Sequence, residues 1–173
     1  MSQAPVNLRG HHLLCMLTYV GRGYTAEHTE TFNQIAARIR DGAAIRIVRG
    51  PDDICQPMIT PESNFHCRDA DVGMRDVLAI QAVSKVLNRT VLPGTTLQLD
   101  RADMLALRTA FADKSSRKGC GGCNWENFCT EVADSGFENS KLLSDNSGAG
   151  ADGLGCPETS VKTRRISFIP AGK

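Results

Sequence analysis

Three cysteines in the last third of the chain form the pattern best suited to chemistry. Cys120, Cys123 and Cys129 follow the order Cys-x2-Cys-x5-Cys, and three glycines surround the first two of them. A two-residue gap that contains glycines lets two thiolates converge on one soft metal ion or on one face of a cluster. The glycines also free backbone N–H groups to bond to sulfur, which stabilises the charge of an iron–sulfur cluster. The spacing therefore predicts a metal centre, with an iron–sulfur cluster as the first choice.

A four-iron cluster and a structural zinc site each usually take four protein ligands, so a fourth donor must come from elsewhere. Cys67 is our first choice and Cys55 our second, because both lie in an irregular segment that can bend toward a site. Cys15 is fixed on an expected helix, and Cys156 follows a linker and is left out. The predicted ligands are therefore Cys67, with Cys55 as its alternative, and the three clustered cysteines Cys120, Cys123 and Cys129.

Two other kinds of chemistry are open to the same cysteines. They could close a tetrahedral zinc site and make the domain a structural scaffold. A thiol enzyme is also conceivable, because His11 and His12 precede Cys15 by four and three residues and can share a helical face with it. The sequence pattern supplies no third group to orient the histidine. We therefore rank Cys15 first as a neighbour of the metal site, then as a packing residue, and last as a nucleophile.

The irregular segment over residues 51–68 carries further polar side chains. Asp52 and Asp53 are explained as turn residues, although such a carboxylate could also orient a ligand or relay a proton. His66 precedes Cys67 and could be a nitrogen ligand of a Rieske-like cluster. A single His–Cys pair without a partner pair favours an ordinary loop histidine.

The composition narrows the classes of protein that this chain can represent. Its 173 residues, 41% of them hydrophobic, are enough for one buried core and too few for two full domains. Lys and Arg total 20 against 19 Asp and Glu, so no net charge attracts nucleic acid or an anionic membrane surface. No stretch reaches the roughly 20 apolar residues of a membrane span, and we identify no signal peptide. We expect a cytoplasmic protein that binds neither nucleic acid nor membrane.

Seven cysteines are many for a chain without an export signal. The cytosol keeps thiols reduced, so disulfides are rare there, and metal binding or redox chemistry explains the cysteines better. The odd number also leaves at least one thiol outside any set of disulfide pairs.

The elements that must position these residues are mostly helices. Apolar residues at helical spacing, with capping residues before them, predict helices over 8–19, 25–42, 69–87 and 100–111, and from 124 onward. The buried face of the third helix should consist of Val77, Ile80, Val83 and Leu87. Runs rich in β-branched residues predict short strands over 45–49 and 95–99.

The expected fold class is α+β, a mostly helical single domain with a small minor sheet and a long cysteine-bearing loop. This metal-binding domain should span residues 1–143. Residues 144–173 are interpreted as a flexible linker rich in Ser, Gly, Asp, Asn and Ala, followed by a basic tail. The tail could add a late strand or docking segment over 166–169.

Several motifs, taken as a set over residues 8–143, resemble a family of small bacterial and archaeal proteins of unknown function. They are Leu8-Arg9-Gly10-His11-His12-Leu13-Leu14-Cys15, Tyr19-Val20-Gly21-Arg22-Gly23-Tyr24, Gly50-Pro51-Asp52-Asp53-Ile54-Cys55 and Cys120-x2-Cys123-x-Trp125-x3-Cys129. The resemblance implies iron–sulfur cluster binding. It marks these positions without giving their roles: His11, His12, Cys15, Asp52, Asp53, Cys55, Cys67, Cys120, Cys123, Trp125 and Cys129.

One departure from this family bears on the ligands. Relatives carry a further cysteine just after the Asp-Asp-Ile-Cys motif, where this chain has Gln56-Pro57-Met58. The departure argues against a cluster held mainly by the middle loop.

The cysteine pattern and the resemblance lead to one expectation of function. We expect an iron–sulfur protein, with a four-iron cluster ahead of a two-iron one and zinc as the alternative cofactor. Its role would be to transfer electrons to a protein redox partner, to sense redox state or to assist another enzyme. The family implies no reaction, so the sequence leaves enzymatic activity open.

Overall fold

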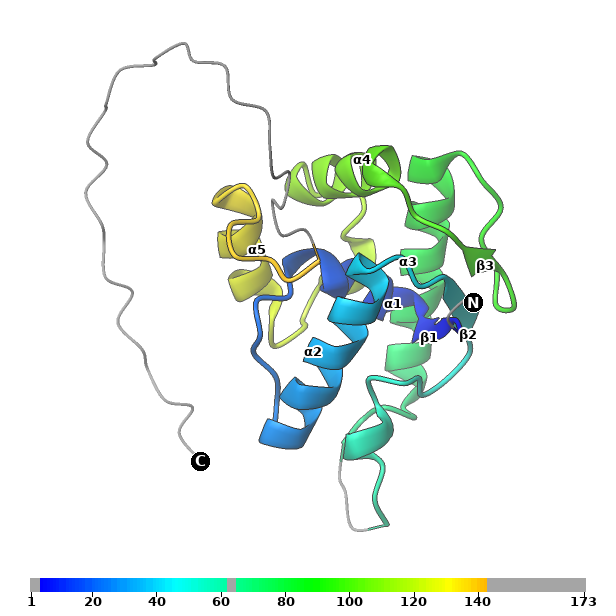
Figure 1. The fold of residues 1–173 in the computed structure, drawn as a ribbon, viewed down its shortest axis with the longest axis vertical. Coiled ribbons are helices and arrows are strands. Elements are labelled where there is room, and N and C mark those ends of the chain that lie inside the picture. Colours follow the sequence, from blue (N-terminus) through cyan, green and yellow to red (C-terminus); the bar gives the residue numbers. More distant parts are fainter. Residues whose placement is uncertain (1–3, 62–64, 143–173) are drawn as a thin grey trace, which may run out of the picture.

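A computed structural model describes residues 4–61 and 65–142 of the chain (Figure 1). Within these residues the chain forms five α-helices and three short strands. In chain order they are β1 (Val6–Arg9), α1 (Gly10–Cys15), α2 (Ala26–Arg40), β2 (Ile45–Val48), α3 (Ala70–Leu87), β3 (Thr96–Leu97), α4 (Arg101–Ala112) and α5 (Glu126–Asp134). The fold is α+β and mostly helical, as the sequence predicts.

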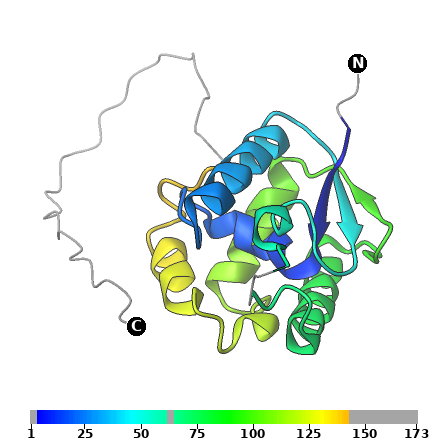
Figure 2. The same ribbon diagram turned by 90° about the horizontal axis from the view of Figure 1, so that it is seen from below.

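The sheet is small and mixed, with the strand order β1-β2-β3. β1 runs parallel to β2, with Val6 beside Ile45, and β3 pairs antiparallel to the other edge of β2. Side chains alternate along a strand, so Val6 and Leu8 point the same way as Ile45 and Ile47, and all four are buried in the core. Figure 2 shows the three strands side by side at one end of the molecule and α5 at the other.

The N-terminal segment differs from the predicted helix over 8–19. Leu8 belongs to β1, which the sequence pattern did not predict, and α1 begins only at Gly10. After six residues α1 tightens into a 3₁₀ turn over Met16–Thr18. The prediction was wrong because four residues are too few to display an alternation, and their apolar side chains continue the helical pattern of the next segment.

α1 lies in the middle of the fold and packs chiefly against α3 (Figure 1). The two helices approach closely because Gly10 has no side chain. A Cβ at this position would collide with the Asp76 carbonyl oxygen and lie 2.8 Å from the Ile80 Cγ1 atom. The crossing brings the start of α1, with its two histidines, onto the buried face of α3.

The buried face of α3 differs in part from the prediction. Val77 is 47% exposed, whereas Ile80 and Val83 are buried as expected. The face also contains Asp76, which is only 7% exposed. Hydrophobic periodicity cannot identify a buried carboxylate, because such a residue is stabilised by specific partners and not by apolar contact.

The remaining predictions agree with the structure in most respects. Thr25 caps α2 by accepting a hydrogen bond from the His28 N–H at 3.1 Å, and Asp100 starts α4 in a capping box with Asp103. Asp69 stands at the N-cap of α3 without a side-chain hydrogen bond. The segment after β2 is irregular apart from a 3₁₀ turn over Gln56–Met58.

Some predictions fall outside the described residues: the linker and tail over 144–173, Cys156 and the late strand over 166–169. Among the helices that the structure describes, none has both the length and the apolar character that crossing a membrane requires.

Candidate functional site

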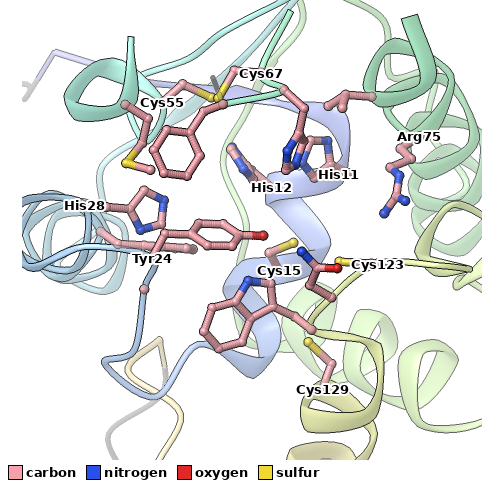
Figure 3. A pocket seen from close by; sticks show the side chains of 18 of the residues that line it. His11, His12, Cys15, Tyr24, His28, Cys55, Cys67, Arg75, Cys123 and Cys129 are labelled. Carbon is pink, nitrogen blue, oxygen red and sulfur yellow. The ribbon is translucent and has the colours of Figure 1, made fainter. Parts of the chain in front are cut away.

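A cavity of about 360 Å³ opens between α1, α3, the segment after β2 and the loop before α5. All four histidines of the chain line it, together with five cysteines. Figure 3 shows Cys15, Cys123 and Cys129 at one end of this cavity, His11 and His12 in the middle, and Cys55 and Cys67 at the other end. The cavity therefore joins most of the residues that the sequence marks for chemistry.

Four cysteines form a group that we call the cysteine quartet: Cys15, Cys120, Cys123 and Cys129. Cys15 ends α1, Cys129 lies in the first turns of α5, and the other two come from the glycine-containing loop between α4 and α5. Cys120 does not line the cavity but packs behind the loop, against the core. The structure thus brings the three predicted cysteines together and adds Cys15.

The thiols of the quartet influence one another electrostatically. Burial raises the pKa of Cys15 well above its ordinary value, and the other three thiols of the quartet raise it further. Burial also raises the pKa values of Cys120 and Cys129, with a smaller contribution from neighbouring thiols. These thiols are partly buried, and neighbouring thiols add to the cost of ionising them, a cost that the positive charge of a metal centre would offset.

Two groups outside the quartet, one hydroxyl and one guanidinium, act on its sulfur atoms. The Thr18 hydroxyl donates to the Cys129 Sγ at 3.2 Å. The guanidinium of Arg117 lowers the pKa of Cys120, in opposition to the larger effect of burial. Arg117 is itself fixed by bonds to the Glu126 carbonyl at 3.1 Å and the Thr130 hydroxyl at 2.7 Å. Both donors would stabilise thiolates that bind a metal.

The loop that carries Cys120 and Cys123 is fitted to α3. Gly119 lies so close to α3 that a Cβ would meet the Arg75 carbonyl oxygen at 2.9 Å. Gly122 adopts a φ of 70°, a left-handed conformation that glycine accepts without strain. The glycines therefore serve the turn and the close packing that bring the thiols toward α1.

Cys67 and Cys55, predicted as the fourth ligand, lie together at the opposite end of the cavity from the quartet (Figure 3). Cys55 is buried, and its pKa is raised by burial, then by the charge of Asp52, and to a smaller degree by Cys67. The Cys67 carbonyl accepts a hydrogen bond from Arg9 at 2.6 Å. The geometry favours Cys15 over either of them as the fourth member of a site around Cys120, Cys123 and Cys129.

His12 is held by Asp52, which is 2% exposed. The His12 Nδ1 lies 2.8 Å from the Asp52 Oδ2, and the same oxygen accepts a bond from the Arg9 N–H at 2.8 Å. The other carboxylate oxygen accepts from the Ile54 and Cys55 N–H groups at 3.1 and 3.2 Å. Burial works against ionisation, but His12 and these N–H donors lower the pKa of Asp52 to about 2.

His11 is held in the same way by Asp76 on α3. Its Nδ1 lies 2.7 Å from the Asp76 Oδ1. The second oxygen of Asp76 binds the guanidinium of Arg9, a side chain only 2% exposed, at 2.7 and 2.9 Å. Burial and the adjacent His12 lower the pKa of His11 to about 4, although Asp76 opposes the shift. His11 is therefore neutral at pH 7, with its Nδ1–H donated to Asp76.

We call these two arrangements the histidine–aspartate pairs: His11 with Asp76 and His12 with Asp52. His12, Asp52 and Cys55 offer ligand atoms within 4.8 Å of one another, which is a spacing that a metal ion could use. However, the Asp52 carboxylate already accepts four N–H groups, so it has little capacity left for a metal ion. The three atoms are close because they share a hydrogen-bond network, and the donor set does not fit a metal ion.

Aromatic side chains form much of the remaining wall. Tyr24 packs against Trp125 and His28 with ring centroids 5.5 Å apart in each case. The ring of Trp125 also lies 5.8 Å from that of Phe128, and both residues line the cavity with Cys123 and Cys129. Arg75 extends from α3 toward the cavity (Figure 3). The cavity thus combines an aromatic wall with cationic and imidazole groups.

Sequence reasoning missed several of these residues. Asp76 carries one detectable signal, since it is an acidic residue four positions from Val72 and Ile80 on an apolar helical stripe. Such a residue requires a buried partner, which predicts an ion pair without identifying it. Arg9 and Arg75 carry no comparable signal, because basic side chains are usually solvated at the surface.

Comparison with known proteins gives a family and no activity. Residues 23–129 match the model of a family described as a protein of unknown function (DUF1284). The match excludes the segment with His11, His12 and Cys15. No curated protein and no solved structure matches the chain.

Proposed function

The chain belongs to the DUF1284 family of proteins of unknown function, and we propose that it holds an iron–sulfur cluster and transfers electrons. The proposed cluster is a four-iron four-sulfur cluster bound by the cysteine quartet. Cys15 takes the place of Cys67, which the sequence favoured as the fourth ligand. With all four iron atoms ligated by protein, no iron is open to a substrate, and the cluster serves as an electron carrier for a protein redox partner.

The observation that carries the proposal is the approach of four thiols from two distant segments of the chain. Cys15 comes from α1 and the other three from the loop and helix around α5, yet the pKa of Cys15 responds to all three. Core packing does not require this convergence, since buried cysteines behave as small apolar residues. The donors on Cys129 and Cys120 add the outer contacts that tune such clusters.

The spacing of the sulfur atoms favours a cluster over zinc. Among the described residues, no three cysteines have sulfur atoms within 4.8 Å of one another. A single zinc ion with Zn–S bonds of about 2.3 Å would draw four sulfurs to within ~3.8 Å of each other. A four-iron cluster binds each thiolate to a different iron atom and therefore needs wider spacing.

The test is metal and sulfide analysis of protein purified without oxygen. We expect brown protein with about four iron and four sulfide ions per chain. The variant Cys15→Ser should lose most of this iron, while Cys67→Ser, the matched control at the other end of the cavity, should keep it. Colourless protein with about one zinc and no sulfide, even after reconstitution, would overturn the proposal.

The two variants also test the ligand assignment separately from the cluster. Iron lost in Cys67→Ser and kept in Cys15→Ser would restore Cys67 as the fourth ligand and leave the cluster in place.

A further inference from the structure

A cluster bound by four cysteines does not need the histidine–aspartate pairs. Two buried carboxylates and the buried Arg9 form one network with the two histidines. Burying charges costs several kcal/mol per ion before their partners compensate. None of these residues belongs to the quartet, so the network indicates a second task in the same cavity.

Each of the two histidines has one ring nitrogen that the carboxylates do not engage. Each Nδ1 is engaged by a carboxylate, at 2.7 Å for His11 and 2.8 Å for His12, and both rings line the cavity. The Nε2 atom of each ring is therefore the one available to a ligand. In the described part of the chain, these two nitrogens have no third ligand atom close enough to complete a site for a single ion. The space they border suits an organic molecule better than a metal ion.

The surroundings of the two carboxylates distinguish the histidines. Asp76 shares its charge between His11 and the guanidinium of Arg9. Apart from His12, the groups that Asp52 bonds are neutral backbone N–H donors. His12 therefore has a carboxylate that no cationic side chain shares, whereas His11 shares Asp76 with Arg9.

Arg75 supplies a positive charge on the same wall. Within residues 4–61 and 65–142, no hydrogen bond or ion pair engages its guanidinium, although the side chain is only half-exposed and lines the cavity. Guanidinium groups bind carboxylates through two parallel hydrogen bonds. Tyr24 and Trp125 add flat apolar surfaces next to it. The volume of about 360 Å³ lies in the range of small-molecule sites.

We propose that this cavity binds a small planar organic acid and that His12 removes a proton from it. Arg75 binds the carboxylate, and the planar body packs against the aromatic wall that Tyr24 and Trp125 form together. The His12 Nε2 lone pair accepts a proton from an O–H or N–H group of the substrate, and the electron pair of that bond stays on the substrate. Asp52 is a positioning residue that stabilises the resulting imidazolium. The quartet takes no part in this step, so the proposal stands independently of the cluster.

A coloured probe tests this step directly. 4-Hydroxy-3-nitrobenzoate is a planar acid whose phenol turns yellow when it loses its proton. At a pH where the free probe is mostly neutral phenol, binding to the purified protein should produce the phenolate colour. Trp125 is the only tryptophan of the chain, so quenching of its fluorescence measures binding at the cavity itself.

Two variants separate the roles of the residues, and iron content is measured for each. His12→Gln should still quench Trp125 but should leave the bound probe as neutral phenol. Arg75→Gln should weaken probe binding by about 10–100-fold, the loss of a charged hydrogen bond. Arg68→Gln, exposed and outside the cavity, is its control.

A second probe, 2-nitrophenol, lacks the carboxylate, and its binding should not respond to Arg75→Gln. Absence of Trp125 quenching by either probe would overturn the site. An unchanged phenolate fraction in His12→Gln would overturn the base. Equal loss of both probes in Arg75→Gln would overturn carboxylate binding by that residue, and changed iron content with unchanged probe binding would assign Arg75 to the cluster instead.

Discussion

The cysteine quartet and the histidine–aspartate pairs face one cavity but are held in different ways. In the pairs, each carboxylate oxygen accepts hydrogen bonds, and Arg9 balances the charge of Asp76. In the quartet, burial and neighbouring thiols raise the pKa values of Cys15, Cys120 and Cys129, and the Thr18 hydroxyl donates to the Cys129 sulfur. In the pairs, the protein itself supplies the hydrogen bonds and the charge compensation that the buried groups need. In the quartet, it does not.

This difference predicts how each region depends on its surroundings. Removing a partner from a complete network leaves a buried charge uncompensated, which is costly. An incomplete site changes little when one weak contact is lost, because most of its stabilisation comes from the group it binds. Substitutions of the two carboxylates should therefore act mainly on folding, and substitutions in the quartet mainly on the metal.

Asp76→Ala should have the largest effect on stability. It leaves Arg9 buried without its ion pair and His11 without its hydrogen bond, so the free energy of unfolding should fall by about 3–5 kcal/mol. Urea denaturation followed by circular dichroism measures the change. Asp71→Ala, at an exposed position of the same helix, should change it by less than ~0.5 kcal/mol. A loss below ~1 kcal/mol for Asp76→Ala would contradict the view that the pairs are a complete network.

Gly10→Ala should be the next most damaging change. Its Cβ would collide with the Asp76 carbonyl and force α1 away from α3, at a cost of about 2–3 kcal/mol. Gly73→Ala is the matched control, because Gly73 lies inside α3 with open space around its Cα and should gain about 0.5–1 kcal/mol. Thermal and urea unfolding of both variants compare them. Equal effects of the two substitutions would show that the helices do not need this close approach.

The stability of the protein should depend on pH in opposite directions for the two regions. The folded state lowers the pKa of His11 to about 4 from 6.5, so the unfolded chain binds its proton first. Stability is complete above pH ~6.5 and should fall by about 3 kcal/mol as the pH drops toward 4. The quartet responds in the opposite direction, because folding raises the pKa values of Cys15, Cys120 and Cys129. The metal-free protein should lose stability as the pH rises beyond 9.

Urea midpoints measured from pH 4 to 10 on metal-free protein test both signs. His11→Gln should flatten the acidic limb only, and Cys15→Ser should reduce the slope of the alkaline limb only. One variant that flattened both limbs would mean that the two regions titrate as one unit.

The sequence predicted the parts of the fold that local rules govern. α2 and α4 carry both a capping residue and an apolar stripe, and β2 alternates cleanly between core and surface. Their boundaries follow from residues next to one another in the chain. β1 was missed because a strand of four residues acquires its identity from pairing with β2, a contact that no local pattern records.

The residues of the candidate site also differ in whether local sequence could predict them. Cys120, Cys123 and Cys129 could be grouped from sequence because a short loop brings them together. Cys15 could not be added, since its approach depends on the crossing of α1 and α3 at Gly10. Asp76 was invisible for a similar reason, because its partners Arg9 and His11 lie far from it along the chain. The places of Cys15 and Asp76 in the site therefore depend on contacts between residues far apart in the chain.

The smallest effect is expected from Thr18→Val. This substitution tests the quartet, the region in which the protein donates few hydrogen bonds. The substitution keeps the shape of the side chain but removes the hydroxyl that donates to the Cys129 Sγ at 3.2 Å. The loss of this bond should change the free energy of unfolding of the metal-free protein by less than ~1 kcal/mol. In the cluster-bound protein, the reduced state carries more negative charge and depends more on this donor, so the reduction potential should fall by about 20–60 mV.

Protein film voltammetry measures the potential of the cluster in the wild type and in Thr18→Val. Thr109→Val is the control, because the Thr109 hydroxyl donates to the Leu105 carbonyl on the exposed side of α4, and its potential should equal that of the wild type. A marked loss of stability in Thr18→Val without any change in potential would contradict the view that the quartet depends mainly on the group that it binds. The quartet would then resemble the histidine–aspartate pairs, a network completed by the protein itself and not by the group that it binds.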